Sequence, residues 1–229
     1  LVSPLSGAWH GLSLVIPAAF LGAMAAVLLA MAVSRAARLT HGAGLVLAGV
    51  AVAAMCNAVT SFLLMVYNVR LASVLAWLMG GFGAGTWSRA GVLALYALPC
   101  LLILAFHARL LNLLLLDDEQ VHHLGVNVER VRLVVLVAAS LAAAAAVSVS
   151  GLIGFVGLIV PHIARQVVGP DHRRLFPLVL VGGATLLILA DLIARVAIAP
   201  SEMPVGVVTA FLGGPFFLYL LWRGRRTVW

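Results

Sequence analysis

The sequence predicts an all-α protein, a polytopic transmembrane bundle in which several helices are broken. Its composition is 64% hydrophobic and only 9% charged, with a mean hydropathy of +1.19, so it lacks the polar surface to cover a soluble globule of 229 residues. Long uncharged runs alternate with short polar stretches. Prolines and glycines interrupt these runs where a soluble core seldom tolerates them, at Pro161, Pro200, Pro204 and Pro215. The chain therefore belongs in a bilayer.

The first two runs predict two full crossings. Leu12 to Val33 contains 22 residues without a charge, enough at 1.5 Å per residue to cross a hydrocarbon core of about 30 Å. Arg35 and Arg38 follow it, so the positive-inside rule places that end in the cytoplasm. The run from Leu39 to Val69 has no arginine or acid and returns the chain to the outer face.

The middle of the chain predicts a partial helix, a crossing and a cytosolic segment. Leu71 to Trp87 is short and ends in the glycine-rich string MGGFGAGTW, which favours an outer half-helix and loop. Ala90 to Phe106 crosses inward. Asp117 to Arg132 is the most polar region of the chain, and we expect a cytosolic helix-loop-helix there.

The next run is too long for one crossing. Leu133 to Ala164 carries no acid or arginine over 32 residues, about 48 Å as one helix. Arginines flank both of its ends, so we expect two crossings with an outer turn at 148–151. After an inner loop at 169–174, the chain crosses outward over 175–198 and inward over 203–222.

The distribution of the arginines supports this topology and disfavours a nucleic-acid-binding protein. The net charge of +7 comes from fourteen arginines against seven acids, with no lysine. The predicted topology leaves only Arg70, Arg89 and Arg195 outside. The fourteen arginines stand singly or in pairs between apolar runs rather than in one patch, which disfavours nucleic-acid binding.

No catalytic motif is present. The sequence has no nucleophile elbow, HExxH motif or paired catalytic carboxylates, and a P-loop is impossible without lysine. Cys56 and Cys100 lie inside apolar runs and are interpreted as packed thiols. His122 and His123 are adjacent, so on a helix they point about 100° apart and do not converge on a metal. The sequence predicts neither an enzyme nor a metal site.

Three strings near the C-terminus carry a family resemblance. GLIGFVGLIVPHIAR from Gly151, LADLIAR from Leu189 and SEMPVGVVTAFLGGPFF from Ser201 resemble the C-terminal signature of FecCD-type permeases, which serve ABC importers for iron-siderophore, haem and cobalamin. The resemblance implies a single permease domain over 1–229 in the bacterial cytoplasmic (inner) membrane. It covers about the last two thirds of a family member, so we expect the first spans to be missing.

The resemblance also implies partners. These are a second permease subunit, identical or homologous, two cytosolic ATPase subunits that bind ATP and magnesium, and an extracytoplasmic substrate-binding protein. No cofactor is expected on this chain itself. An ion-coupled secondary transporter or channel, with Asp191, Arg195 and His162 as a proton or ion pathway, is the alternative. The amphipathic cytosolic segment discriminates between them, since only the importer needs an ATPase dock.

That cytoplasmic coupling segment is assigned to 107–132. A short amphipathic helix there can place Leu116, Val121 and Leu124 in a groove of the ATPase, and Gly125 permits the turn that ends it. A solvated loop is the alternative. The residues assigned to coupling are Asp117, Asp118, Glu119, Val121, Leu124 and Gly125.

The outer end carries an isolated charge pair. Asp191 and Arg195 are four residues apart on one helical face, and each alone would cost about 2.5–3.5 kcal/mol near the bilayer centre. A structural ion pair satisfies this requirement. The resemblance implies a further role for Arg195, docking of the binding protein, with Arg70 as a weaker candidate.

The remaining assignments also follow the resemblance. Polar residues on the run 39–69 and near the C-terminus are expected along the substrate path, although polar contacts between helices are an equal alternative. The path candidates are Asn57, Thr60, Ser61 and Thr209; the cytoplasmic gate candidates are His41, Gly42 and Ala43; and structural roles fall to Gly154, Gly157, Pro161, His162 and Asp191. Gly151, Gly154 and Gly157 are expected to allow close helix contact.

Overall fold

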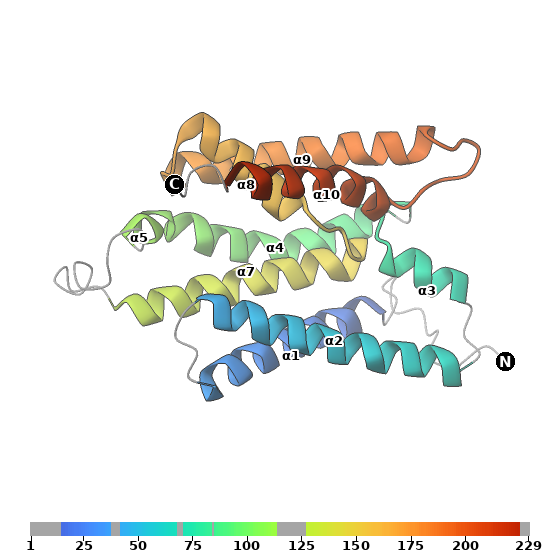
Figure 1. Cartoon of the computed structure of the whole chain (residues 1–229), viewed down its shortest axis with the longest axis horizontal. Helices are drawn as coiled ribbons and strands as arrows, with labels where there is room; N and C mark the ends of the chain where they lie inside the picture. The colour runs from blue at the N-terminus through green and yellow to red at the C-terminus, as the bar shows by residue number, and fades with distance from the viewer. Residues whose placement is uncertain (1–14, 38–41, 68–70, 84, 114–126, 225–229) are drawn as a thin grey trace.

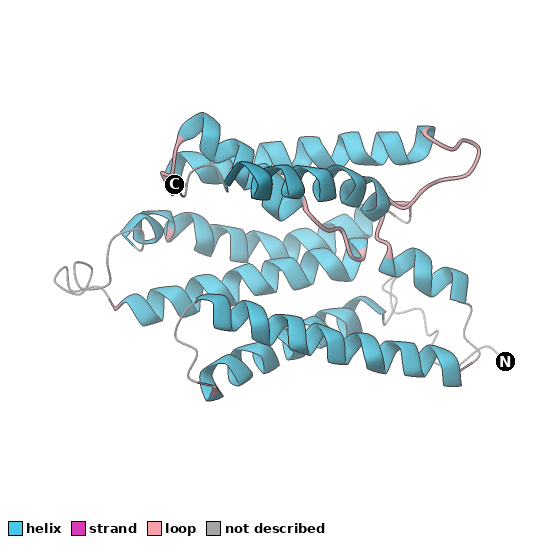
Figure 2. Cartoon of the chain, in the orientation of Figure 1, coloured by secondary structure: helices cyan, strands magenta, loops and turns pink. Residues whose placement is uncertain are grey.

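The computed structural model describes residues 15–37, 42–67, 71–83, 85–113 and 127–224, and within these ranges its regular elements are all helices (Figure 1, Figure 2). Their bounds are α1 Val15–Ala36, α2 Gly42–Val66, α3 Leu71–Leu78, α4 Trp87–Phe106, α5 Ala108–Leu113, α7 Val128–Ser150, α8 Val156–Val168, α9 His172–Val196 and α10 Val205–Gly224. This agrees with the predicted fold class.

Five of these helices are long and apolar enough to cross a membrane: α1, α2, α4, α7 and α9. They coincide with predicted crossings. The predicted half-helix is α3, which has only 8 residues before the glycine-rich loop. The part of the chain between α5 and α7 lies outside the described residues, and so does the predicted helix-loop-helix in it.

The long run 133–164 breaks where the sequence predicts it. Helix α7 ends at Ser150, and Gly151 follows with φ of 70°. The second half differs from a full crossing helix, because α8 has only 13 residues, or about 20 Å. The stretch 151–155 between them is non-helical, and Phe155 has φ of 65°. A short helix preceded by irregular backbone therefore replaces a continuous span.

The helices form two layers (Figure 1). Helix α7 packs against α4 and α1, with α2 beside α1, while α9 packs against α8 and α10. Helix α5 also contacts α9 and so connects the layers at one end. That end holds the starts of α7 and α9 and the last turn of α10, and α3 and the α9–α10 loop lie at the opposite end (Figure 1). The segments predicted to share a face therefore lie at the same end, and we call the two ends the predicted cytoplasmic end and the predicted outer end.

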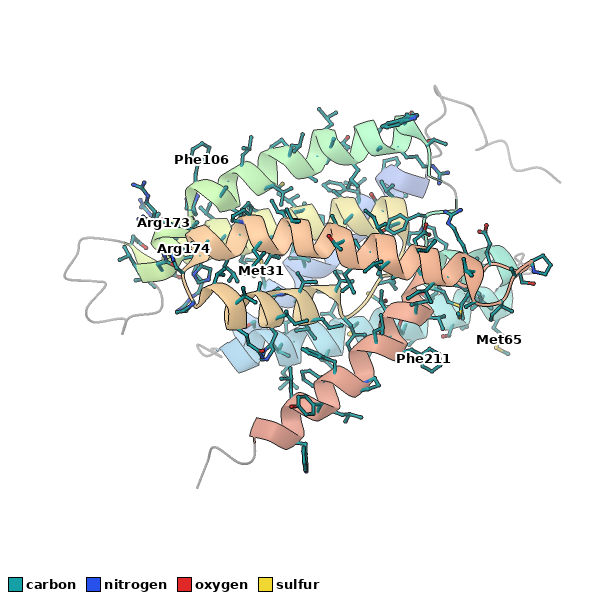
Figure 3. All side chains as sticks on the ribbon, turned by 90° about the horizontal axis from the view of Figure 1, so that it is seen from above. Met31, Met65, Phe106, Arg173, Arg174 and Phe211 are labelled. Atoms are coloured by element: carbon teal, nitrogen blue, oxygen red, sulfur yellow. The ribbon has the colours of Figure 1, made fainter. Side chains whose placement is uncertain are left out.

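The apolar side chains are distributed as in a membrane protein. Met65, Phe106 and Phe211 point outward and are largely exposed, whereas Met31 is buried (Figure 3). The buried residues are mostly small, and one cluster joins Ala190 and Ala194 of α9 to Val205 and Val208 of α10. Small residues let helix backbones approach closely where lipid supplies the apolar surroundings.

Candidate functional site

Three interrupted backbones meet at the outer end of the bundle, at Gly80 after α3, Gly151 after α7 and Gly206 in the first turn of α10. A Cβ atom on Gly151 would overlap the carbonyl oxygen of Trp77, and one on Gly206 would overlap that of Met79. Gly80 and Gly151 also have φ of 67° and 70°. Only glycine satisfies both the left-handed conformation and the approach of another backbone.

Hydrogen bonding reinforces this junction. The amide of Gly81 donates to the carbonyl of Ser150 at 2.8 Å, which ties the end of α3 to the end of α7. A Cβ on Gly80 would overlap the carbonyl of Leu152. The broken helix ends are therefore joined through main-chain atoms. We call Gly80, Gly151 and Gly206 the glycine junction.

An open apolar groove of about 460 Å³ lies beside the glycine junction. Its walls come from the end of α3, the α7–α8 break and the first half of α10. The lining residues are Leu78, Met79, Leu152, Gly206, Val207, Ala210, Phe211 and Pro215. Nothing in this lining carries a charge.

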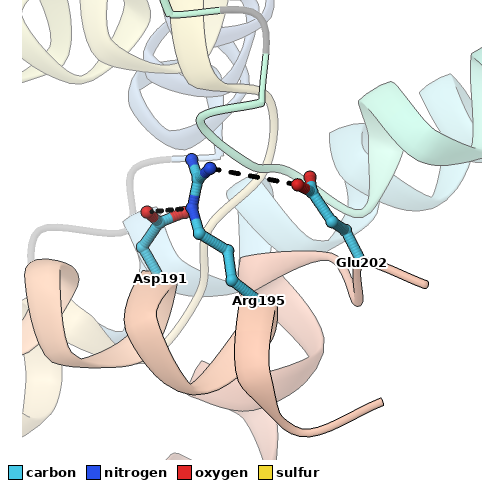
Figure 4. A network of polar contacts seen from close by, with 3 residues as sticks. All are labelled: Asp191, Arg195 and Glu202. Atoms are coloured by element: carbon cyan, nitrogen blue, oxygen red, sulfur yellow. Dashed lines mark hydrogen bonds and ion pairs between the residues drawn. The ribbon is translucent and has the colours of Figure 1, made fainter. Parts of the chain in front are cut away.

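Asp191, Arg195 and Glu202 form a network of charged side chains at the predicted outer end (Figure 4). Arg195 donates from Nε to Oδ2 of Asp191 at 2.8 Å, and its Nη1 lies 3.9 Å from Oε1 of Glu202. The Arg195 side chain is 45% exposed, Asp191 25% and Glu202 63%. The predicted ion pair is therefore present, but it is half-exposed at the outer end and has a second acid beside it.

A second polar network lies at the predicted cytoplasmic end. The side chain of Asn112 on α5 donates from Nδ2 to Oδ1 of Asp171 at 2.6 Å. Oδ1 of Asn112 accepts from the backbone amide of His172 at 2.8 Å and lies 2.7 Å from Nδ1 of that histidine. Asp171 is the N-cap of α9 and accepts from the amide of Arg173. We call these three residues, Asn112, Asp171 and His172, the inner clamp.

Hydrogen bonding in the inner clamp changes the acidity of Asp171. The backbone amide of Arg173, and then the side chain of Asn112, donate to the carboxylate and lower the pKa of Asp171. Because the folded-state pKa is lower than the unfolded one, ionised Asp171 stabilises the folded protein above about pH 4, the unfolded value. This contribution is lost as pH falls through the lowered pKa.

Acidification should therefore loosen the inner clamp. We expect the midpoint of thermal unfolding in detergent to fall between pH 5 and pH 3 for the wild-type chain, and to fall less steeply for Asp171→Ala, which is already less stable at pH 7. Tryptophan fluorescence during heating measures both midpoints. Identical pH profiles for the two proteins would contradict this role of Asp171.

The predicted path residues do not come together within this chain. Asn57 and Ser61 are exposed on α2, and the hydroxyl of Thr60 donates to the carbonyl of Cys56 at 2.8 Å. Thr209 on α10 is only 1% exposed and donates to the carbonyl of Gly206 at 3.1 Å. Helices α2 and α10 nevertheless lie on the same, nearer face of the molecule in Figure 1.

The residues in and before α8 with predicted structural roles differ in what they contact. Pro161 lies inside α8, and Nε2 of His162 lies 3.0 Å from Nε2 of Gln166. The ring of His162 also meets Phe216 edge-on at 5.8 Å. Within this chain a Cβ on Gly154 or Gly157 would meet nothing within 4 Å, so Gly151 alone of the three expected glycines makes a close contact here.

Several predicted residues lie outside the described part of the chain. These are Arg70, His41 and the coupling residues Asp117, Asp118, Glu119, Val121, Leu124 and Gly125. Gly42 and Ala43 of the predicted gate form the start of α2. Among the described residues, no three histidine, cysteine or acidic side chains are grouped as a metal site would require.

Sequence reasoning missed three features of the two ends. Glu202 stands in a loop seven residues beyond Arg195, where no helical spacing relates them. Gly80 and Gly206 become significant only when three separate segments meet. Asn112 did carry a signal, because it is the one polar residue in the run LLNLLLL, from Leu110 to Leu116.

Comparison with known proteins gives consistent results. Residues 2–223 match the FecCD transport family. The chain is 44% identical over 211 residues to the hemin transport system permease protein HmuU of Yersinia pestis, covering 91% of this chain and 62% of that protein. It is 44% identical over 209 residues to the cobalamin import system permease protein BtuC of Halobacterium salinarum, covering 90% and 55%. The chain thus spans less than two thirds of these curated relatives.

A solved structure agrees with the fold. It is an inward-facing conformation of a transporter assigned to the metal-chelate type of ABC transporter. The two chains superpose with a TM-score of 0.78 at 31% sequence identity, over 91% of this chain and 71% of the other.

Proposed function

Because the chain belongs to the FecCD transport family, we propose that it forms the greater part of the permease subunit of an ATP-binding-cassette importer. Its cargo is an iron chelate, haem or cobalamin, which it moves across the cytoplasmic membrane. The observation that carries the proposal is the family match over almost the whole chain. The helical bundle with broken outer ends supports it.

The permease works with separate proteins. Two cytosolic ATPase subunits bind the coupling segment at 107–132, and closure of these subunits around ATP drives alternating access. The described parts of this segment support the assignment, since α5 and the start of α7 lie at the predicted cytoplasmic face (Figure 1). The exposed Arg165, Arg173 and Arg174 belong to the same face.

An extracytoplasmic binding protein docks at Arg195. The geometry of the charged network supports this role, because Asp191 holds Nε and leaves the terminal nitrogens of the guanidinium directed away from it (Figure 4). Glu202 lies at 3.9 Å from one of them, beyond ordinary hydrogen-bond distance. A carboxylate of the partner can therefore pair with the free edge of the guanidinium. Arg70 is the second docking candidate.

The cargo path lies on the face that carries α2 and α10. A second permease subunit, a copy of this chain or a homologue, completes it, with Asn57, Thr60, Ser61 and Thr209 as path candidates. His41, Gly42 and Ala43 form the cytoplasmic gate. The largely exposed surface of α2 supports an interface on this face.

The alternative of an ion-coupled transporter has less support. It requires a relay joining His162 to Asp191 and Arg195. In the described part of the chain His162 contacts Gln166 and Phe216, whereas Asp191 is paired with Arg195. Those contacts satisfy each group locally.

Association with an ATPase tests the proposed function. We expect the complete permease to co-purify with its ATPase and to stimulate ATP hydrolysis, and we expect Gly125→Trp to abolish both by blocking the coupling helix in its groove. Gly91→Trp is the matched control, because a Cβ on Gly91 in α4 meets nothing within 4 Å. If the wild-type permease binds no ATPase, the importer assignment fails. Otherwise iron chelates, haem and cobalamin are screened next.

A further inference from the structure

The inner clamp is unusual in joining distant parts of the chain. Its hydrogen bonds link residues 59 and 60 positions apart, whereas most side-chain hydrogen bonds in the described ranges join residues at most four positions apart, such as Thr185 to Val181 and Ser148 to Ala145. A local bond stabilises the helix that contains it. The inner clamp instead fixes one helix to the terminus of another.

The inner clamp uses both the donor and the acceptor of the Asn112 side chain. Asn112 uses both ends of its amide, donating to Asp171 and accepting from His172. Asp171 shares the same Oδ1 between Asn112 and the amide of Arg173, so the amide of Asn112 is tied to the helix cap itself. All three residues are half-buried, and the bonds of Asn112 to Asp171 and His172 are partly shielded from solvent.

The clamp also lies between two regions with proposed roles. Helix α5 ends at Leu113, one residue after Asn112, and is itself part of the coupling segment at 107–132. Helix α9 starts at His172 and has 25 residues, about 37 Å of continuous helix. Near its far end it carries Asp191 and Arg195.

We propose that Asn112 is a positioning residue that couples the cytosolic ATPase-binding segment to helix α9, so that movement of the segment displaces the outer charged network around Arg195. Continuous helices transmit such displacements, provided that a defined contact moves them as one body. This inference rests on the proposed importer function. It assigns the mechanical link to the side-chain amide of Asn112, which joins α5 to the α9 cap.

An exchange of the two partners tests the link. Asn112→Asp places a carboxylate against Asp171 and removes the donor, so the contact is lost. In the double variant with Asp171→Asn, the donor and acceptor change sides: the amide nitrogen at 171 donates to the carboxylate at 112, which still accepts from His172. Because Oδ1 of Asp171 serves both Asn112 and the amide of Arg173, the side chain at 171 has to turn so that its remaining oxygen caps α9. Rescue by the double variant is expected only if the contact itself matters.

The readout is the position of α9 in the complete permease bound to its ATPase. Nitroxide labels at Ser88→Cys and Ala197→Cys, both exposed at the outer end, report the α4–α9 distance by electron paramagnetic resonance, with Cys56 and Cys100 replaced by serine. We expect ATP with vanadate to shift this distance. Asn112→Asp should lower the shifted fraction by about fivefold or more, at the lower end of typical coupling between sites, and the double variant should restore it.

Two further variants complete the design. Asn112→Ala removes the contact without adding charge and should lower the shifted fraction like Asn112→Asp. Thr185→Ala is the control on α9, since it removes a hydrogen bond that stays within the helix, and it should leave the shift unchanged. These comparisons separate loss of the link from a general weakening of α9.

Each contrary outcome has a distinct meaning. If the wild-type complex binds its ATPase but shows no shift with ATP, or if Asn112→Ala and Asn112→Asp shift as fully as wild type, the proposal is wrong. It is also wrong if the double variant folds but remains as impaired as Asn112→Asp. If the wild-type permease binds no ATPase, the importer function itself fails.

Discussion

Gly151→Val is expected to leave almost no folded protein in the membrane. The valine would need φ near 70°, and its Cβ would overlap the carbonyl oxygen of Trp77. A β-branched residue in the left-handed region costs about 1–3 kcal/mol, and overlap with a backbone atom cannot be relieved by a change of rotamer. Fluorescence-detected size-exclusion chromatography after detergent extraction measures the fraction that remains monodisperse.

Gly154→Val is the matched control for this substitution. It lies three residues further along the same irregular stretch, and a Cβ there meets nothing within 4 Å. We therefore expect Gly154→Val to extract much as the wild-type protein does. Equal stability of the two variants would show that the glycine junction is not closed as the structure describes it.

Arg195→Glu should weaken docking of the binding protein by about a hundredfold. The substitution puts a third carboxylate beside Asp191 and Glu202 and opposes an acidic partner, and juxtaposed like charges suppress association strongly. Surface-plasmon resonance of the complete permease in nanodiscs measures the affinity. The effect should diminish at high salt, because the network is half-exposed and therefore screened.

Substitutions at Glu202 and Arg89 distinguish a docking site at Arg195 from attraction by overall charge. Glu202→Gln removes a carboxylate that competes for the guanidinium and should strengthen docking several-fold. Arg89→Glu changes the same charge on α4, also at the predicted outer end, and should have a much smaller effect. An affinity that responds equally to Arg195→Glu and Arg89→Glu would indicate attraction by overall charge instead of a docking site.

Hydropathy and charge predict the crossings of this chain well, because each crossing is a property of consecutive residues. The break at Gly151 is also predictable, since a run of 32 apolar residues flanked by arginines exceeds one bilayer. The short length of α8 is not, because the same apolar residues suit an extended stretch that packs against other helices. Irregular backbone is tolerated there because it meets the backbones of other segments at the glycine junction.

Some of the polar contacts could be predicted from the sequence and others could not. Asp191 and Arg195 could be paired from their spacing of four on one helix. No spacing relates Asn112 to Asp171, because the packing of α5 against α9 brings them together. Arg195 and Glu202 are paired by the course of the loop after α9, which helical spacing does not describe. Nor can periodicity identify the partner of Gly206, whose neighbours are carbonyl groups of two other segments.

The glycine junction has a consequence for how such a protein diversifies. Its three segments meet through backbone carbonyl and amide groups, which approach closely because glycine has no side chain. The glycine junction therefore does not depend on the identity of the side chains around it. The groove residues Leu78, Val207 and Phe211 stand beside the joint without forming it. Substitutions in this lining can therefore change the shape and polarity of the groove, while the joint that holds its walls together is kept.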